Sequence, residues 1–283
     1  MSEKSRFTVS PSWLEERLET PGLSIVDASW YLPAHGRDGR AEHEAGRIPG
    51  AVVFDQDAVG HPETDLPHAL PDAATFQRHV SAMGISEDDT IVVYDGPGLF
   101  SAPRVWWMFR VMGAKNVLLL DGGLDGWRAE GRPLTDKPVQ TAPAVFNAKL
   151  DEERVASLEA MLQLVEDATA QIADARPAGR FTGAEPEPRA GMRSGHMPGA
   201  RNVPASALSR DGRLLPPDEL RALFEGAGVD LSRPVVTSCG SGVTAAVISL
   251  ALETVGHSDH RLYDGSWSEW GGRADTPVET GEA

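Results

Sequence analysis

The chain has 283 residues, enough for two domains of ordinary size, and 42 acidic against 26 basic residues give it a formal net charge of −16. Such an acidic surface repels phosphate backbones and anionic membranes, so we expect neither nucleic acid nor a membrane as a partner. One cysteine excludes an internal disulfide framework, the apolar stretches are too short to span a bilayer, and the sequence does not open with a secretion signal. A cytoplasmic protein with a reduced thiol is therefore predicted.

The first half alternates helical and strand patterns. Ser10 followed by Pro11 is typical of a helix start. Further on, residues 72–83 and 102–112 have helical patterns, and the short apolar runs 91–94 and 117–120 follow them as strands. Strands that alternate with helices favour a parallel sheet covered by helices on both faces.

A linker and a second set of the same elements follow. Residues 136–154 contain two prolines and no clear period, so we place a linker at 138–154 between domains at 7–137 and 155–279. Ser157 marks the first helix of the second domain. Near its end, the strand 235–237 leads into the segment CGSGVT at 239–244 and a helical pattern at 243–252.

The two halves repeat each other. IVDA at 25–28 matches IADA at 172–175, GRIPGA at 46–51 matches GHMPGA at 195–200, and IVVYDG at 91–96 matches VVTSCG at 235–240. Asp95 therefore stands in the first half where the second half has Cys239, and a carboxylate cannot carry sulfur. The loop at Asp95 either closes a site at the domain interface or is a surface loop.

Cys239 is the candidate nucleophile. Gly240 and Gly242 lack a Cβ, so the backbone can curl with its N–H groups toward the sulfur, and Ser241 and Thr244 add hydroxyl donors. Such a nest stabilises a thiolate and equally a persulfide anion, which makes covalent sulfur transfer plausible. The alternative is a buried cysteine that acts only as a small hydrophobic residue.

Other chemistries have less support. A cysteine phosphatase needs an arginine six residues after the cysteine to clamp phosphate, but position 245 is alanine. The eight histidines show no metal-ligand spacing, and no GxGxxG segment follows the first strand, so we expect no metal and no nucleotide cofactor. His196 and the tryptophans are interpreted as packing residues; the latter are Trp106, Trp107, Trp127, Trp267 and Trp270.

Three segments, together with the duplication, resemble the tandem rhodanese-type sulfurtransferases, and the resemblance covers nearly the whole chain. The segments are 239–244, 195–200 and DGSWSEWG at 264–271. The resemblance implies an α/β fold of two tandem rhodanese-like domains, each a mostly parallel sheet flanked by helices, with the second domain catalytic and the first non-catalytic. It also implies that Cys239 carries the sulfur as a persulfide, without a cofactor. Ser241 would be the second catalytic residue, and the remaining loop residues would be Gly240, Gly242, Val243 and Thr244.

Two arginines suggest the sulfur donor. Family members that use 3-mercaptopyruvate carry substrate-binding arginines in the stretches that contain Arg180 and Arg189 here, so the resemblance implies that these side chains hold the carboxylate and keto oxygen of the donor. Members that use thiosulfate resemble CRKGVT, with two cations beside the sulfur, whereas this chain has Gly240 and Ser241. Thiosulfate:cyanide sulfurtransferase activity and a non-catalytic sulfur-carrier or interaction module are the alternatives.

The acceptor and one proton relay stay open. A thiol such as thioredoxin or a small dithiol, or cyanide, would serve as acceptor. Family members commonly have a histidine at the position of Arg47, where it is proposed to relay protons with the serine. Here the relay is dispensable, or His43 or Asp38 replaces it, or Arg47 is an extra anion grip.

Overall fold

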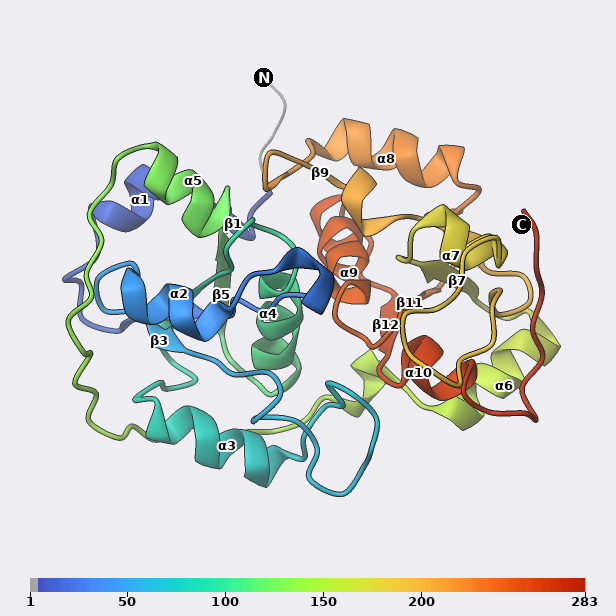
Figure 1. The fold of residues 1–283 in the computed structure, drawn as a ribbon, viewed down its shortest axis with the longest axis horizontal. Helices are drawn as coiled ribbons and strands as arrows, with labels where there is room; N and C mark the ends of the chain where they lie inside the picture. Colours follow the sequence, from blue (N-terminus) through green and yellow to red (C-terminus); the bar gives the residue numbers. More distant parts are fainter. Residues whose placement is uncertain (1–4, 283) are drawn as a thin grey trace.

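Two α/β domains make up the computed structural model, which describes residues 5–282 (Figure 1). The first domain is built on a five-stranded sheet in the order β1-β5-β4-β2-β3, and every neighbouring pair of strands is parallel. Its strands are β1 (Thr8–Val9), β2 (Leu23–Asp27), β3 (Val52–Val53), β4 (Thr90–Tyr94) and β5 (Asn116–Leu120).

The second domain repeats this topology, with a parallel sheet in the order β6-β12-β11-β7-β8. Its strands are β6 (Val155–Ala156), β7 (Gln171–Asp174), β8 (Arg201–Asn202), β11 (Val235–Ser238) and β12 (His260–Tyr263). A small antiparallel pair, β9 (Ser209–Arg210) and β10 (Arg213–Leu214), is added to it. The identical strand order confirms both the predicted fold class and the internal repeat.

Helices cover both faces of the first sheet because its central strand β4 is apolar on both sides. Ile91 and Val93 belong to the same buried cluster as residues of α3 (Ala73–Ala82) and α4 (Ala102–Val111). Val92 and Tyr94 pack on the other face, against α1 (Pro11–Glu15) and α5 (Gly123–Ala129). The remaining helical segments are α2 (Gly39–Ala45) and the 3₁₀ turn η1 (Pro33–His35).

The second sheet is covered in the same way. Helices α8 (Pro217–Gly226) and α9 (Ala245–Thr254) pack on the face turned toward the first domain, and α6 (Leu158–Asp167), α7 (Ala178–Thr182) and α10 (Ser266–Trp270) pack on the other. Short 3₁₀ turns, η2 (Glu152–Arg154) and η3 (Ala205–Ala207), complete the domain. Helix α9 begins two residues later than predicted, because Val243 and Thr244 still belong to the loop that surrounds Cys239.

The predicted helix starts have their expected caps. Ser10 Oγ accepts the N–H of Trp13 at 3.2 Å, and Ser157 Oγ accepts the N–H of Ala160 at 3.2 Å. Each side chain thus satisfies one backbone donor that has no partner inside the helix.

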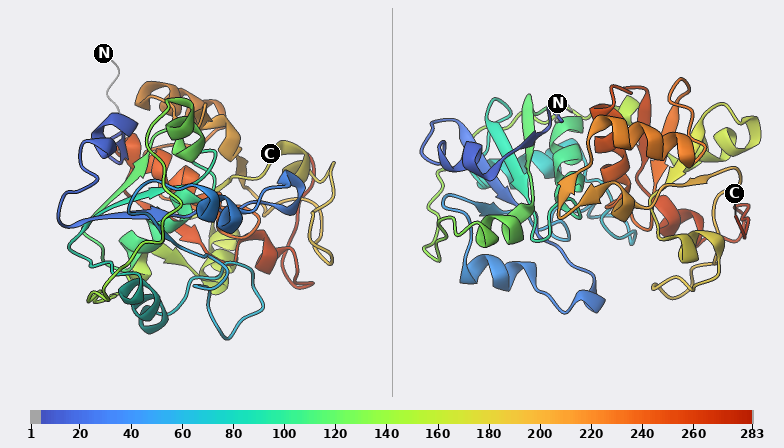
Figure 2. Two further views of the ribbon diagram at one scale, coloured as in Figure 1. Left: turned by 60° about the vertical axis from the view of Figure 1, so that its left-hand side comes forward. Right: turned by 90° about the horizontal axis from the view of Figure 1, so that it is seen from above.

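The domains meet through α4 and α9, which lie side by side between the two sheets (Figures 1 and 2). Buried side chains of both helices belong to one hydrophobic cluster that continues across the interface. Glu253 at the end of α9 is buried and pairs with Arg110 of α4 at 2.8 Å and with Arg154 at 2.7 Å. The interface is therefore as well packed as a domain core, and it holds the two sheets in a fixed relation.

The predicted linker packs against the first domain. Phe146 is fully buried, and its N–H donates to Ser81 Oγ at 3.2 Å, while the N–H of Lys149 donates to the carbonyl of Met112 at 3.0 Å. Between residues 5 and 282, no helix is long and apolar enough to cross a membrane.

Candidate active site

Cys239 lies directly after β11, at the carboxyl end of the second parallel sheet, and only 1% of its surface is exposed. Its N–H donates to Ser266 Oγ at 3.1 Å, and its carbonyl accepts the N–H of Trp267 at 2.9 Å. The next carbonyl, that of Gly240, accepts both the N–H and the hydroxyl of Ser268, at 2.8 and 2.6 Å. Helix α10 therefore fixes the backbone on either side of the sulfur.

A side chain at either loop glycine would require neighbouring atoms to move. Gly242 has a φ of +79°, and a Cβ on it would lie 2.9 Å from the carbonyl oxygen of Asp264. Gly240 has no such backbone requirement, but a Cβ there would lie 3.0 Å from Arg180 Nη2. The first glycine thus keeps space for an arginine, and the second permits the turn that leads into α9.

The equivalent loop of the first domain shows how this backbone directs its N–H groups at one acceptor. Asp95 is fully buried, and its Oδ2 accepts the N–H groups of Phe100, Ser101 and Ala102 at 2.8, 2.7 and 2.8 Å. Burial raises the pKa of Asp95, and the backbone donors oppose that shift. A carboxylate therefore occupies the nest in the domain that lacks a cysteine.

The same first-domain loop packs at the domain interface. A Cβ on Gly98 would lie 2.5 Å from the carbonyl oxygen of Gly212 in the second domain. That carbonyl also accepts the N–H of Gly122 at 3.0 Å. The loop is not a free surface loop.

Both predicted arginines flank the Cys239 loop. Arg180 of α7 donates through Nε and Nη2 to the buried carboxylate of Glu187. Arg189 donates to Ser268 Oγ at 3.3 Å. Burial lowers the pKa of Arg189, and the negative charge of a Cys239 thiolate opposes that shift. The structure thus brings Cys239, Ser241, Arg180 and Arg189 together.

A histidine of the first domain completes the site and was not predicted. His68 Nδ1 lies 2.9 Å from Ser241 Oγ, and His68 Nε2 lies 3.2 Å from Asp57 Oδ1. The hydrogen bond with His68 lowers the pKa of Asp57, so this carboxylate is ionised and accepts from Nε2–H. In neutral His68, Nδ1 then carries the lone pair that accepts the Ser241 hydroxyl proton.

The groups first considered for the proton relay lie elsewhere. His43 Nδ1 is 2.8 Å from Asp27, and Asp38 caps α2 by accepting two backbone N–H groups. Buried Arg47 donates to the carbonyl oxygens of His43, Asp136 and Lys137. Across residues 5–282, the histidine that contacts Ser241 is His68, whereas His43, Asp38 and Arg47 have other partners.

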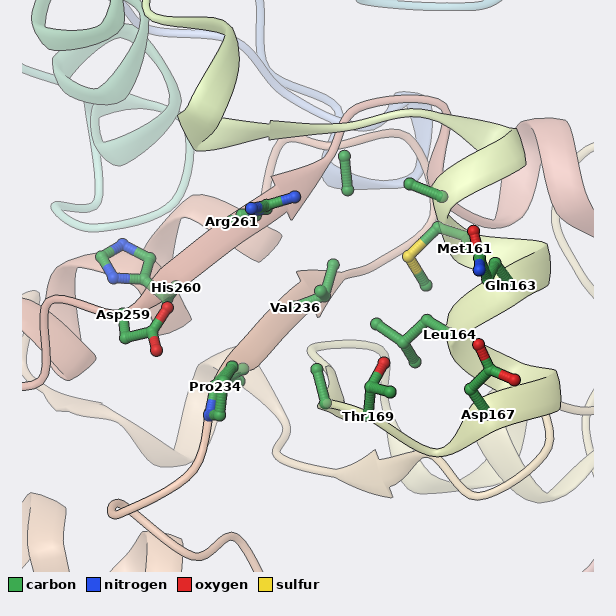
Figure 3. Close-up of a pocket in the computed structure, with 14 residues that line it drawn as sticks. Met161, Gln163, Leu164, Asp167, Thr169, Pro234, Val236, Asp259, His260 and Arg261 are labelled. Carbon is green, nitrogen blue, oxygen red and sulfur yellow. The ribbon is translucent and has the colours of Figure 1, made fainter.

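The other singled-out residues pack as expected. His196 is buried, its ring stacks on Phe181 at 3.9 Å, and the five tryptophans are at most 2% exposed. A cavity of about 400 Å³ lies between α6 and the second sheet, where Met161 and Leu164 face Val236 (Figure 3). Its walls include none of the predicted site residues, so it is separate from the Cys239 site.

Comparison with known proteins agrees with this geometry. The model of the rhodanese-like domain matches residues 10–130 and again residues 157–273. The chain belongs to the rhodanese-like domain family. It is 46% identical to the 3-mercaptopyruvate sulfurtransferase of Escherichia coli K12, over 96% of this chain and 97% of that protein. It is 44% identical to the human 3-mercaptopyruvate sulfurtransferase, over 95% and 93% of the two chains.

Thiosulfate sulfurtransferases are also similar, the bovine one being 43% identical over 97% of this chain and 94% of that protein. Among solved structures, the rhodanese-fold 3-mercaptopyruvate sulfurtransferase SseA of Escherichia coli superposes with a TM-score of 0.86 at 43% identity, covering 93% of this chain and 99% of that one. These findings confirm the predicted resemblance and a transferase of the sulfurtransferase type.

Proposed function

We propose that this rhodanese-family chain transfers sulfur from 3-mercaptopyruvate to a thiol or cyanide through a persulfide on Cys239, and releases pyruvate. One observation carries the proposal. A cysteine at the end of a parallel strand is flanked by two arginines and by a serine that contacts a histidine–aspartate pair. The similarity to proteins named 3-mercaptopyruvate sulfurtransferase supports the choice of donor.

The nest supports a sulfur anion at Cys239. In the first domain the matching loop donates three N–H groups to the Asp95 carboxylate. The second domain has a thiol at that position, in the loop that leads into α9 at Ala245, and the N-terminal end of the helix adds positive potential there. We expect the corresponding N–H groups of the second loop to serve a thiolate before the reaction and a persulfide anion after it.

The arginines suit the acidic end of the donor. Arg180 is within reach of the Gly240 backbone, and Arg189 is held by Ser268, which also binds the Gly240 carbonyl. A guanidinium pair on one side of the sulfur can bind a 2-oxo carboxylate through parallel hydrogen bonds. The donor's thiol would then point at Cys239.

Atoms and charges balance in the sulfur-transfer step when Ser241 and His68 carry the proton. The Cys239 thiolate attacks the donor sulfur, the bond from that sulfur to C3 breaks, and its electron pair goes to C3 as the pyruvate enolate. Ser241 and His68 take the proton of the donor thiol and return it to C3. The products are pyruvate and a Cys239 persulfide anion. A thiolate acceptor then attacks the outer sulfur and restores the Cys239 thiolate.

Thiosulfate is the second candidate donor, because relatives named thiosulfate sulfurtransferase are 43% identical to this chain. The loop disfavours it. Position 240 cannot carry a side chain unless Arg180 moves, and position 241 offers a hydroxyl hydrogen-bonded to His68 instead of a cation. A doubly charged donor therefore finds fewer cations beside the sulfur than a CRKGVT loop supplies.

Thiol chemistry supports the proposed acceptors and the proposed compartment. Thioredoxin, a small dithiol or cyanide can each attack the outer sulfur, and a reducing compartment such as the cytoplasm keeps Cys239 in the thiol form.

The test compares kcat/KM for 3-mercaptopyruvate with that for thiosulfate, using cyanide as a common acceptor and Cys239→Ser as the blank. We expect the ratio to favour 3-mercaptopyruvate. A ratio of the two kcat/KM values below one would make thiosulfate the preferred donor. Pyruvate release by Cys239→Ser at the wild-type rate would refute the mechanism.

A further inference from the structure

We propose that Arg104 and Asp264 are positioning residues that hold His68 of the first domain against Ser241 of the second. The inference rests on the proton relay of the proposed function and deepens it. It explains how a catalytic site is completed by a side chain from the domain that has no cysteine.

His68 needs such support because its backbone is unfavourable. It lies in an irregular loop and has a φ of +60°, a left-handed conformation that residues other than glycine seldom adopt. Its imidazole must nevertheless meet Ser241 on one side and Asp57 on the other. A loop with this backbone keeps one conformation only where surrounding contacts impose it.

Arg104 and Asp264 supply those contacts from the two domains. Arg104, in the first turn of α4, donates through Nη2 to the His68 carbonyl at 2.8 Å and to Asp264 Oδ1. Asp264, which follows β12, accepts the N–H of Leu70 through Oδ2 at 2.7 Å. Arg104 and Asp264 therefore bind the backbone on both sides of Ala69, at His68 and at Leu70. These contacts fix His68 relative to the second domain.

Arg104 also lies against the nucleophile loop. A Cβ on Gly242 would be 3.2 Å from Arg104 Nη1, and the guanidinium stacks over Trp107 with its carbon 4.7 Å from the ring centroid. One contact network thus connects His68 with the loop that carries Ser241.

An arginine that only stabilised the domain interface would have hydrogen-bond acceptors for all its donors. Arg104 is fully buried, yet its Nε and Nη1 have no hydrogen-bond partner in the described part of the chain. Buried donors without a partner are disfavoured, so Arg104 is not placed where all its own N–H groups find acceptors. Its position is set instead by its contacts with the His68 carbonyl and Asp264. Another interdomain pair, Arg110 and Glu253, contacts neither His68 nor the Cys239 loop and provides a matched control.

The experiment is a double-mutant cycle of Asp264→Asn and His68→Ala, with kcat and KM measured for pyruvate release from 3-mercaptopyruvate. We expect Asp264→Asn alone to lower kcat roughly tenfold or more, with KM nearly unchanged, since positioned proton transfer contributes at least that much. In the His68→Ala background we expect Asp264→Asn to have no further effect. The isosteric control Glu253→Gln should stay within about twofold of wild type, as expected for a residue outside the reacting groups.

An equal loss from Asp264→Asn in both backgrounds would overturn the inference, as would a comparable loss in Glu253→Gln. Should Asp264→Asn not fold, Arg104→Lys takes its place in the cycle with the same expectations. The proposed function is tested separately by His68→Ala. Wild-type kcat in that variant would refute the relay and the inference together, whereas a slow His68→Ala with an additive cycle would refute only the inference.

Discussion

Replacement of Gly240 by alanine tests whether Arg180 holds the donor. The backbone at Gly240 is not in the left-handed region, so alanine meets no conformational penalty there. Its Cβ would, however, lie 3.0 Å from Arg180 Nη2, and the guanidinium must shift while Glu187 still binds it. A lost hydrogen bond to a charged group is worth about 1.5 to 3 kcal/mol, so kcat/KM for 3-mercaptopyruvate should fall by roughly 10- to 100-fold.

The assay is pyruvate release at varied 3-mercaptopyruvate, with persulfide loading from polysulfide as the reference reaction. Polysulfide has no carboxylate for Arg180 to bind, so its loading rate should not change. Gly226→Ala is the matched control, because a Cβ at that position meets nothing within 4 Å. An unchanged kcat/KM for 3-mercaptopyruvate in Gly240→Ala would show that Arg180 does not bind the donor.

Three further outcomes are expected. His68→Ala should lower kcat for 3-mercaptopyruvate by roughly 100-fold while polysulfide still loads Cys239, and equal loss with both donors would argue against a proton relay. Asp95→Ala leaves three N–H groups, two of them buried, without their acceptor and should lower the free energy of unfolding in urea by about 3 kcal/mol or more. Asp95→Asn keeps an acceptor and should cost less, and equal costs would mean that these N–H groups need no acceptor. Burial lowers the pKa of His260 to about 4, below the unfolded value near 6.5, so its contribution to stability is present at pH 7 and is lost as the pH falls toward 4. Between pH 7 and pH 5 the wild type should therefore lose about 2 kcal/mol more than His260→Gln, and parallel pH profiles would contradict this.

The fold could be predicted because its signals are local. Apolar runs of strand length alternate with helical patterns, and Ser10 and Ser157 mark helix starts by a contact only three residues away. The repeat of these elements then predicted two sheets of the same kind, and both sheets have the same strand order.

The site was predictable only in part, because half of it depends on distant contacts. Cys239 and Ser241 share one short loop with two glycines, which is a contiguous signal. His68 contacts Ser241 across 173 positions of the sequence, and it lies in an irregular loop without any periodic pattern. Arg104 and Asp264 meet across 160 positions. The role of Arg47 stayed open because its partners, the carbonyls of Asp136 and Lys137, lie 89 and 90 positions away in the sequence.

The central claim, that Cys239 takes sulfur from 3-mercaptopyruvate, is tested most directly by one single-turnover measurement without acceptor. Pyruvate is quantified and the protein is then weighed by mass spectrometry. We predict about one pyruvate per chain and one thiol-labile adduct of about 32 Da, one sulfur atom, on Cys239. Pyruvate without an adduct, or an adduct that persists in Cys239→Ser, would contradict the account.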